Sequence, residues 1–152
     1  MTFTSSASDA GQPTPSRVEA PAAASVRRRI LVMDDEEIIC ELLRELLGSF
    51  GHEVATSAEG GETVRRYREA MELGRPFDLV IMDLTIPLGG MNGEETIRAL
   101  RDLDPKVRAI VASGYLQNPV LTNYRDHGFC GMVTKPYSIS ELLREVSRAM
   151  EG

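Results

Sequence analysis

Four charged residues each come directly after a short apolar run of the sequence. They are Asp34, Asp35, Asp83 and Lys135. Apolar runs that are short, rich in Val and Ile and separated by helical patterns predict buried strands of a parallel sheet. In an open α/β sheet the carboxyl ends of the strands share one edge, and ligands bind at that edge. We therefore expect three carboxylates and one ammonium group to meet at a single place.

Carboxylates that lie this close repel one another unless a cation or a proton offsets their charge. Asp83 ends the most apolar predicted strand, Asp78–Met82, so we expect it at the centre of the edge. There it could accept a phosphoryl group if positive charge neutralised the donor. Mg²⁺ prefers oxygen ligands and takes one or two carboxylates. We expect Asp35 and Asp83 to bind the ion directly, the backbone carbonyl near Thr85 to complete the protein ligands, and Asp34 to act through water.

Two further residues fit a phosphoryl group at this edge. Lys135 offers a point charge for a phosphoryl oxygen, and Pro136 forces a turn that fixes where the lysine side chain emerges. Ser113 places a hydroxyl group one step past the fourth predicted strand. A solvated lysine and a turn serine are the alternatives for these two. Glu36 and Glu37 are better explained as acidic residues at the positive end of a helix.

The elements that must position these residues alternate along the chain. Strands are predicted over Arg29–Met33, His52–Thr56, Asp78–Met82, Val107–Ala112 and Cys130–Thr134. Helices are predicted over Glu36–Phe50, from Ser57 or Ala58 to about Leu73, over Gly93–Leu103, more weakly over Pro119–His127, and after a cap at Ser138 or Ser140. Five such strand–helix units with right-handed crossovers predict an α/β fold, a doubly wound five-stranded parallel sheet with helices on both faces.

Composition divides the 152 residues into a tail and one domain. Residues 1–27 are rich in Ser, Ala, Pro and Thr and have few large apolar side chains, so we expect a disordered N-terminal tail. Residues 28–152 then form the folded domain. The net charge of −6 argues against a nucleic-acid partner. The basic run Arg27–Arg29 is expected to be a solvated strand entry, with a polyanion contact as the alternative.

The cysteines, the histidines and the lack of a targeting or membrane segment limit the class of protein further. Cys40 and Cys130 are too few and too poorly spaced for a disulfide framework or a zinc site, so both are predicted to be reduced core thiols. No signal peptide and no apolar run long enough to span a bilayer is present, which predicts a cytoplasmic protein without membrane insertion. His52 and His127 have no partner at catalytic spacing and are expected to be structural.

The candidate site residues, in their order along the alternating strands and helices, resemble the receiver domain of bacterial response regulators. The resemblance covers about Arg29 to Gly152. The residues that carry the resemblance are Asp34-Asp35, Asp83, Ser113-Gly114 and Lys135-Pro136. It implies a flavodoxin-like fold with strand order 2-1-3-4-5. It also implies transfer of a phosphoryl group from a histidine-kinase phosphohistidine to Asp83, with Mg²⁺ as cofactor. Lys135 and Ser113 would read the phosphoryl group and shift the face made by the fourth helix and fifth strand to control a downstream protein target.

The local sequence is most similar to that of receivers attached to sensory hybrid histidine kinases. This holds for the segments Val32–Glu37, Ala112–Tyr115 and Lys135–Tyr137. Two departures from the family pattern stand out. Met132 occupies the position, three residues before the lysine, where many receivers carry an aromatic switch residue, and Tyr115 is a candidate substitute. The loop between Pro87 and Gly93 is longer than the commonest form, which should alter the mouth of the site.

Three functions compete. The first is a phosphoacceptor switch, which is not an enzyme in the usual sense because it catalyses only its own phosphorylation and dephosphorylation. Its partners would be a sensor histidine kinase or a phosphotransfer protein. The second is a haloacid-dehalogenase-like phosphohydrolase, but its motif needs an acid where this chain has Thr85. The third is a docking module that needs no phosphate. We favour the first, as a stand-alone receiver or as the receiver piece of a larger kinase, because all the expected acceptor residues are present.

Overall fold

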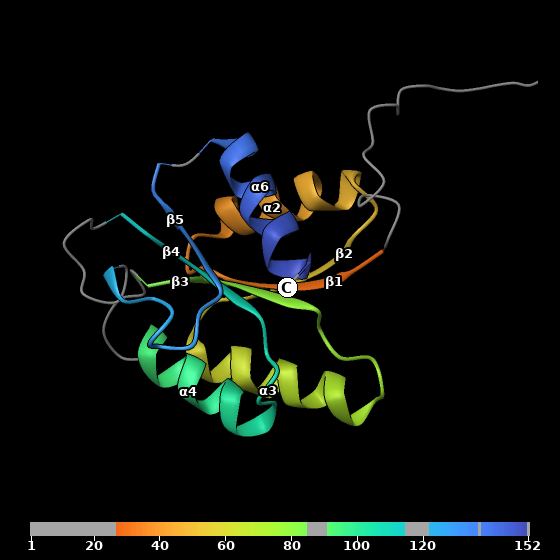
Figure 1. The fold of residues 1–152 in the computed structure, drawn as a ribbon. Helices are drawn as coiled ribbons and strands as arrows, with labels where there is room; N and C mark the ends of the chain where they lie inside the picture. The colour runs from red at the N-terminus through yellow and green to blue at the C-terminus, as the bar shows by residue number, and fades with distance from the viewer. Residues whose placement is uncertain (1–26, 85–90, 115–121, 137, 152) are drawn as a thin grey trace, which may run out of the picture.

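A computed structural model describes residues 27–84, 91–114, 122–136 and 138–151. These residues alternate between strands and helices along the whole domain (Figure 1). The predicted N-terminal tail, apart from residue 27, lies outside the described residues. The tail therefore stays a prediction.

Five parallel strands form one sheet in the order β2-β1-β3-β4-β5. Their bounds are β1 (Arg29–Met33), β2 (Glu53–Ser57), β3 (Leu79–Asp83), β4 (Ala109–Ser113) and β5 (Gly131–Thr134). Every residue of the central strand β3 is buried, as expected for a strand covered on both faces. The predicted fold class and the strand order 2-1-3-4-5 are both confirmed.

Helices cover both faces of the sheet (Figure 1). Helices α2 (Glu37–Ser49) and α6 (Ile139–Glu151) pack on one face, and α3 (Gly60–Glu72) and α4 (Gly93–Leu103) pack on the other. The alternation of strand side chains divides the core in two. Leu79 and Ile81 join the layer under α2 and α6, whereas Val80 and Met82 join the layer over α3 and α4.

The register brings the carboxyl ends of the inner strands to one edge. Met33 of β1 lies beside Met82 of β3, and Asp83 lies beside Ala112 of β4. Residues that directly follow β1 and β4 must therefore emerge close to the end of β3. This alignment positions the candidate site, which is built from strand ends rather than from any one local motif.

The predicted start of the second helix, at Ser57 or Ala58, is wrong. Ser57 is the last residue of β2 and is buried, with its hydroxyl group 2.6 Å from the hydroxyl group of Thr63. Helix α3 begins at Gly60, and the carboxylate of Glu59 caps it by accepting the N–H groups of Gly61 and Glu62. The Glu59 carboxylate thus satisfies two of the first N–H groups of the helix, which have no partner within the helix itself.

The predicted helix over Pro119–His127 is borne out only in part: Thr122 is helical, but the described residues after it are not. Residues 123–128 form consecutive turns, in which Asp126 N–H donates to Asn123 and Gly128 N–H donates to Arg125. Gly128 then has a positive φ of 101°, which only glycine adopts readily. Residues 119–121 lie outside the described residues. At the last helix, the Ser138 hydroxyl group accepts the N–H of Glu141 and confirms the predicted cap.

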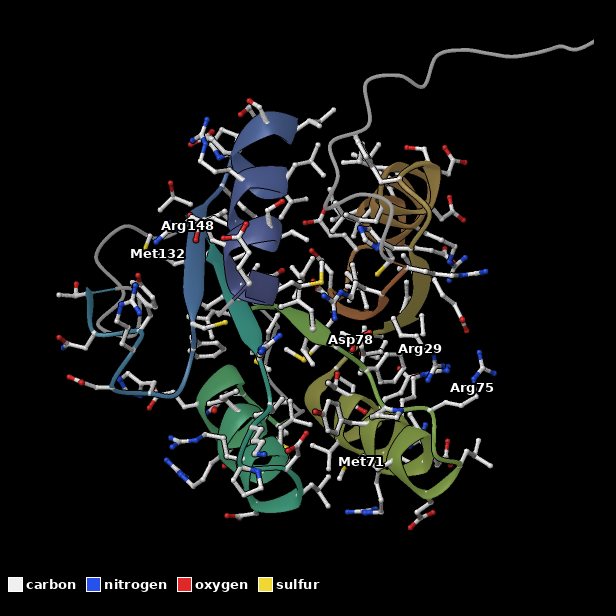
Figure 2. All side chains as sticks on the ribbon, turned by 45° about the vertical axis from the view of Figure 1, so that its right-hand side comes forward. Arg29, Met71, Arg75, Asp78, Met132 and Arg148 are labelled. Carbon is white, nitrogen blue, oxygen red and sulfur yellow. The ribbon has the colours of Figure 1, made fainter. Side chains whose placement is uncertain are left out.

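The basic run behaves as a strand entry in the described part of the chain. Arg28 lies 4.0 Å from Asp78, and Arg29 lies 3.4 Å from Glu53, which also pairs with Arg75 at 3.1 Å. Figure 2 shows Arg29, Arg75 and Asp78 gathered at the same end of the sheet. Carboxylates thus neutralise two arginines of the run, which favours the structural interpretation of the basic run over a polyanion contact.

Cys40 is buried, Cys130 is partly buried, and both are free thiols, as predicted. None of the helices in the described ranges has the length and apolar content of a membrane-spanning segment. Within the described residues, neither histidine contacts the carboxylates of Asp34, Asp35 or Asp83. Nδ1 of His52 accepts the N–H of Arg28 at 3.2 Å, and Nδ1 of His127 lies 3.9 Å from Glu94.

Candidate functional site

The carboxyl edge of the sheet brings together the charged residues that the sequence singled out. Asp83 is the last residue of β3, Asp34 directly follows β1, and Lys135 directly follows β5. Nζ of Lys135 lies 3.1 Å from Oδ2 of Asp34 and 3.1 Å from Oδ2 of Asp83. One ammonium group therefore bridges two carboxylates that are 49 residues apart in the chain. The predicted convergence is confirmed.

Burial makes this cluster electrostatically demanding. The side chains of Asp34 and Asp83 are only 4% and 2% exposed, and that of Lys135 is 20% exposed. Charges removed from water in this way cost free energy unless they are paired and hydrogen-bonded. The lysine lies within hydrogen-bonding distance of both acids, so the structure provides part of that compensation.

A third carboxylate leaves the cluster with excess negative charge. Asp35 is exposed, and one carboxylate oxygen from each of Asp34, Asp35 and Asp83 lies within 4.8 Å of the other two. Three carboxylates against one ammonium group favour a further cation at this place. Oxygen donors of this kind suit a hard divalent ion such as Mg²⁺ rather than a metal that prefers sulfur or nitrogen.

The pKa values report the same imbalance. Burial raises the pKa of the Asp34 carboxyl, and the nearby charge of Asp83 raises it further, against the lowering effect of hydrogen bonds from Glu36 and Lys135. For Lys135, burial alone would lower the pKa of the ammonium group, but the two carboxylates outweigh burial and raise it. The lysine is therefore held in its charged form, whereas the charged form of Asp34 is disfavoured.

The backbone holds Asp34 in place. Its N–H donates to the carbonyl of Ser57 at 3.0 Å, and its Oδ1 accepts the N–H of Glu36 at 2.9 Å. The Sγ of Cys40 also donates to the Asp34 carbonyl at 3.3 Å. Sequence reasoning identified Cys40 only as a core thiol and missed this contact. No spacing rule links the two positions, because the contact depends on how α2 leaves the sheet.

Of the two other predicted site residues, the structure describes Ser113 but not Thr85. Ser113 is the last residue of β4 and is fully buried, and its carbonyl accepts the N–H of Lys135 at 2.8 Å. The strand that carries the serine is thus tied directly to the residue that carries the ammonium group. Thr85, predicted to offer its carbonyl to the metal, lies outside the described residues, as does Tyr115.

Comparison with known families decides what kind of protein carries this site. Residues 30–147 match the family described as the response regulator receiver domain. The chain belongs to the response regulator receiver family. It is thus a receiver domain of two-component signalling, and the resemblance drawn from the sequence is confirmed.

Individual relatives agree with this assignment. The receiver is 30% identical over 122 residues to the chemotaxis protein CheY of Thermotoga maritima, covering 80% of this chain and 96% of that protein. It is 28% identical to sensor kinase CckA of Brucella abortus, covering 89% of this chain but only 14% of the kinase. A solved receiver domain from Clostridium thermocellum superposes with a TM-score of 0.71 at 25% identity, covering 82% of this chain and 94% of that one.

Met132 distinguishes the β5 strand of this receiver. It replaces the aromatic residue expected three positions before the lysine, and its partly buried side chain packs against the core layer of α3 and α4. The N–H of Met132 donates to Oε1 of Glu145 at 3.4 Å, and Oε2 of Glu145 pairs with Arg148. Figure 2 labels Met132 on β5 and Arg148 on α6. The Glu145 carboxylate of α6 thus contacts the backbone of β5, which is an edge strand of the sheet.

Proposed function

We propose that Asp83 accepts a phosphoryl group from a phosphohistidine of a sensor histidine kinase or a phosphotransfer protein, with Mg²⁺ as cofactor. The observation that carries the proposal is the bridge from Lys135 to both Asp34 and Asp83, each at 3.1 Å. A structural ion pair would need one carboxylate. A site that gathers three carboxylates around one ammonium group is suited to a divalent cation and a dianionic phosphoryl group.

The described residues fit the metal. Asp34, Asp35 and Asp83 would hold the ion, since their oxygens lie within 4.8 Å of one another and carry more negative charge than Lys135 offsets. Mg²⁺ would supply positive charge to the phosphoryl oxygens during transfer. Thr85 remains the predicted source of a carbonyl ligand.

The chemistry assigned to the protein is a displacement at phosphorus. An oxygen of the Asp83 carboxylate forms a bond to phosphorus as the bond from phosphorus to the imidazole nitrogen of the donor breaks, and the electron pair of that bond stays with the imidazole. Lys135 orients the carboxylate through its contact with Oδ2 and offers positive charge to the phosphoryl oxygens. The hydroxyl group of Ser113 is the proposed partner of one phosphoryl oxygen.

We further propose that the result is a switch and not metabolic turnover. Phosphorylation would draw Ser113 and Lys135 toward the phosphoryl oxygens and change the face formed by the fourth predicted helix, Pro119–His127, and β5. This change would alter binding of a downstream protein in the cytoplasm. Lys135 directly follows β5, and its N–H is bonded to Ser113, so both groups are mechanically linked to that strand. Met132 would fill the role of the missing aromatic residue by repacking on the same strand.

A phosphotransfer profile tests this proposal. Phosphorylated histidine kinases are mixed with the wild-type chain, with Asp83→Asn and with Asp102→Asn, which removes an exposed carboxylate near the carboxyl end of α4. The labelled phosphoryl group of the kinase should pass to wild type and to Asp102→Asn but not to Asp83→Asn. Chelation of Mg²⁺ should stop the transfer. Equal labelling of Asp83→Asn and wild type would exclude Asp83 as the acceptor.

A further inference from the structure

A second charged cavity lies at the opposite edge of the sheet, where β4 and β5 begin. It has a volume of about 500 Å³. Four cationic side chains line it: Lys106, Arg108, Arg125 and Arg148. They come from the approach to β4, from the turns over residues 123–128 and from the last turn of α6. We call this cavity the basic pocket.

The charge of the basic pocket runs against the composition of the chain. The sequence has 23 acidic and 17 basic residues, yet no carboxylate is among the described residues that line the pocket. Arg148 pairs with Glu145, which lies outside the lining. Within the described ranges, Lys106, Arg108 and Arg125 form no ion pair at all. Three cations are therefore left for a ligand.

Helix capping accounts for only part of this cluster. Cations are favourable at the carboxyl end of a helix, and Nη1 of Arg108 donates to the carbonyl of Met150 in α6 at 3.1 Å. This bond uses one of the five N–H donors of the guanidinium group. Arg125 lies over the ring of Tyr124, 5.2 Å from its centroid, and such stacking leaves the edge of the guanidinium group open. Lys106 is exposed and forms no side-chain hydrogen bond within the described ranges.

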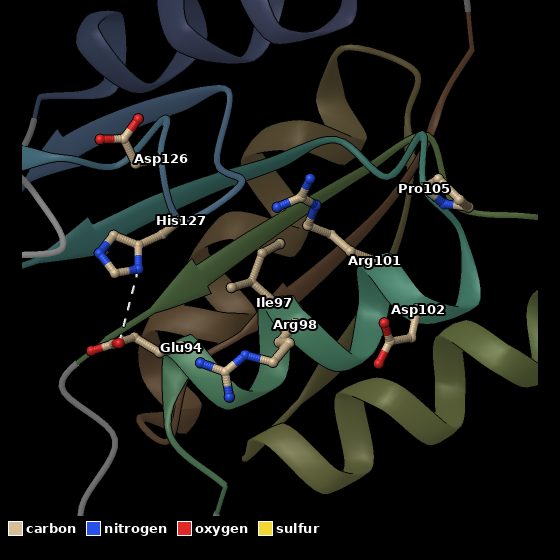
Figure 3. A pocket seen from close by; sticks show the side chains of 8 residues that line it. All are labelled: Glu94, Ile97, Arg98, Arg101, Asp102, Pro105, Asp126 and His127. Carbon is tan, nitrogen blue, oxygen red and sulfur yellow. Dashed lines mark ion pairs between the residues drawn. The ribbon is translucent and has the colours of Figure 1, made fainter.

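A neighbouring cavity shows what a charge-balanced pocket of this protein looks like (Figure 3). It has a volume of about 350 Å³ and lies between α4 and the other side of the same turns. Arg98 and Arg101 line it, but so do Glu94, Asp102 and Asp126. This second cavity therefore has no preference for anions, and it provides a matched control for the basic pocket.

We propose that the basic pocket binds a small ligand that carries more than one phosphate group. Guanidinium groups bind phosphate oxygens in a bidentate manner, and three of them line the pocket. One phosphate group carries a charge of about −1.5 to −2, so three unpaired cations favour a ligand with at least two. Val107 and Ala149 add apolar surface for the body of the ligand. The size of the pocket is that of a small-molecule site.

Amide NMR titration of the full chain in EDTA tests the proposal, with inorganic phosphate, pyrophosphate and ADP as probes. Pyrophosphate and ADP should saturate and shift the amides of Val107 and Ala149, while those of Asp34 and Asp83 stay in place. Arg125→Ala should weaken the binding of pyrophosphate by about tenfold, which is about 1.4 kcal/mol. Arg98→Ala, in the charge-balanced cavity, should leave it unchanged.

Several results would overturn this proposal. They are a dissociation constant for pyrophosphate above about 10 mM, equal binding of inorganic phosphate and pyrophosphate, or equal losses in Arg125→Ala and Arg98→Ala. Because Arg125 is exposed, its removal should leave the fold intact, and Lys106→Ala provides a second variant. Asp83→Asn should bind pyrophosphate normally, so failure here and failure of phosphoryl transfer are separate outcomes.

Discussion

Replacing Lys135 with Met should destabilise the protein in the absence of metal. The ammonium group lies 3.1 Å from one oxygen of each of two buried carboxylates. At an effective dielectric constant of about 20, each pair at this distance attracts with about 5 kcal/mol before any desolvation cost is counted. Desolvation of the buried lysine offsets much of this attraction. We expect a net loss of about 3 kcal/mol, at the lower end of the range for broken buried pairs.

Urea unfolding in EDTA at neutral pH measures this loss. Lys106→Met is the matched control, because Lys106 is the only other lysine of the sequence and its side chain is exposed. The control should change the free energy of unfolding by less than about 0.5 kcal/mol. Added Mg²⁺ should stabilise Lys135→Met by more than it stabilises the wild type, since the cluster then lacks its own cation. If Lys135→Met unfolded at the same urea concentration as wild type, the electrostatic reasoning would be refuted.

Three further substitutions test packing and protonation. Gly60→Ala should lower the free energy of unfolding by more than about 1 kcal/mol, because the added Cβ would overlap the Thr96 hydroxyl oxygen. Gly48→Ala has open space around the added Cβ and should stabilise α2 by about 0.5–1 kcal/mol. Thermal unfolding measures both variants, and equal effects would contradict the packing. Burial, then the charge of Arg28, lowers the pKa of His52, so its contribution to stability is present above pH about 6.5 and is lost as the pH falls through the lowered value. Unfolding midpoints between neutral and mildly acidic pH should fall less steeply for His52→Asn, and an unchanged slope would count against this role.

The convergence of Asp34, Asp83 and Lys135 could be predicted because each follows a buried strand, and parallel strands end at one edge. The strand order 2-1-3-4-5 came from the resemblance to receiver domains, whereas the parallel sheet and its two-sided layering followed from the alternation of apolar runs and helical patterns. The sheet and its layering depend on periodicity, which a single sequence displays directly.

Other details depend on tertiary contacts that no local pattern encodes. The cap of α3 came from Glu59, a residue type that serine and aspartate outrank at that position, so the helix start was placed too early. The contact from Cys40 to Asp34 depends on the angle at which α2 leaves β1. The turns at residues 123–128 contain Asn123 and Gly128, whose turn chemistry competes with the weak helical pattern.

Mapping the phosphorylated residue tests the central claim most directly. The chain is incubated with Mg²⁺ and a phosphorylated histidine kinase, the acyl phosphate is reduced with borohydride, and tandem mass spectrometry locates the residue that has become homoserine. We expect the reduced residue at position 83 alone, and none when Mg²⁺ is chelated. A reduced residue at position 34 or 35, or labelling that does not depend on Mg²⁺, would contradict the account.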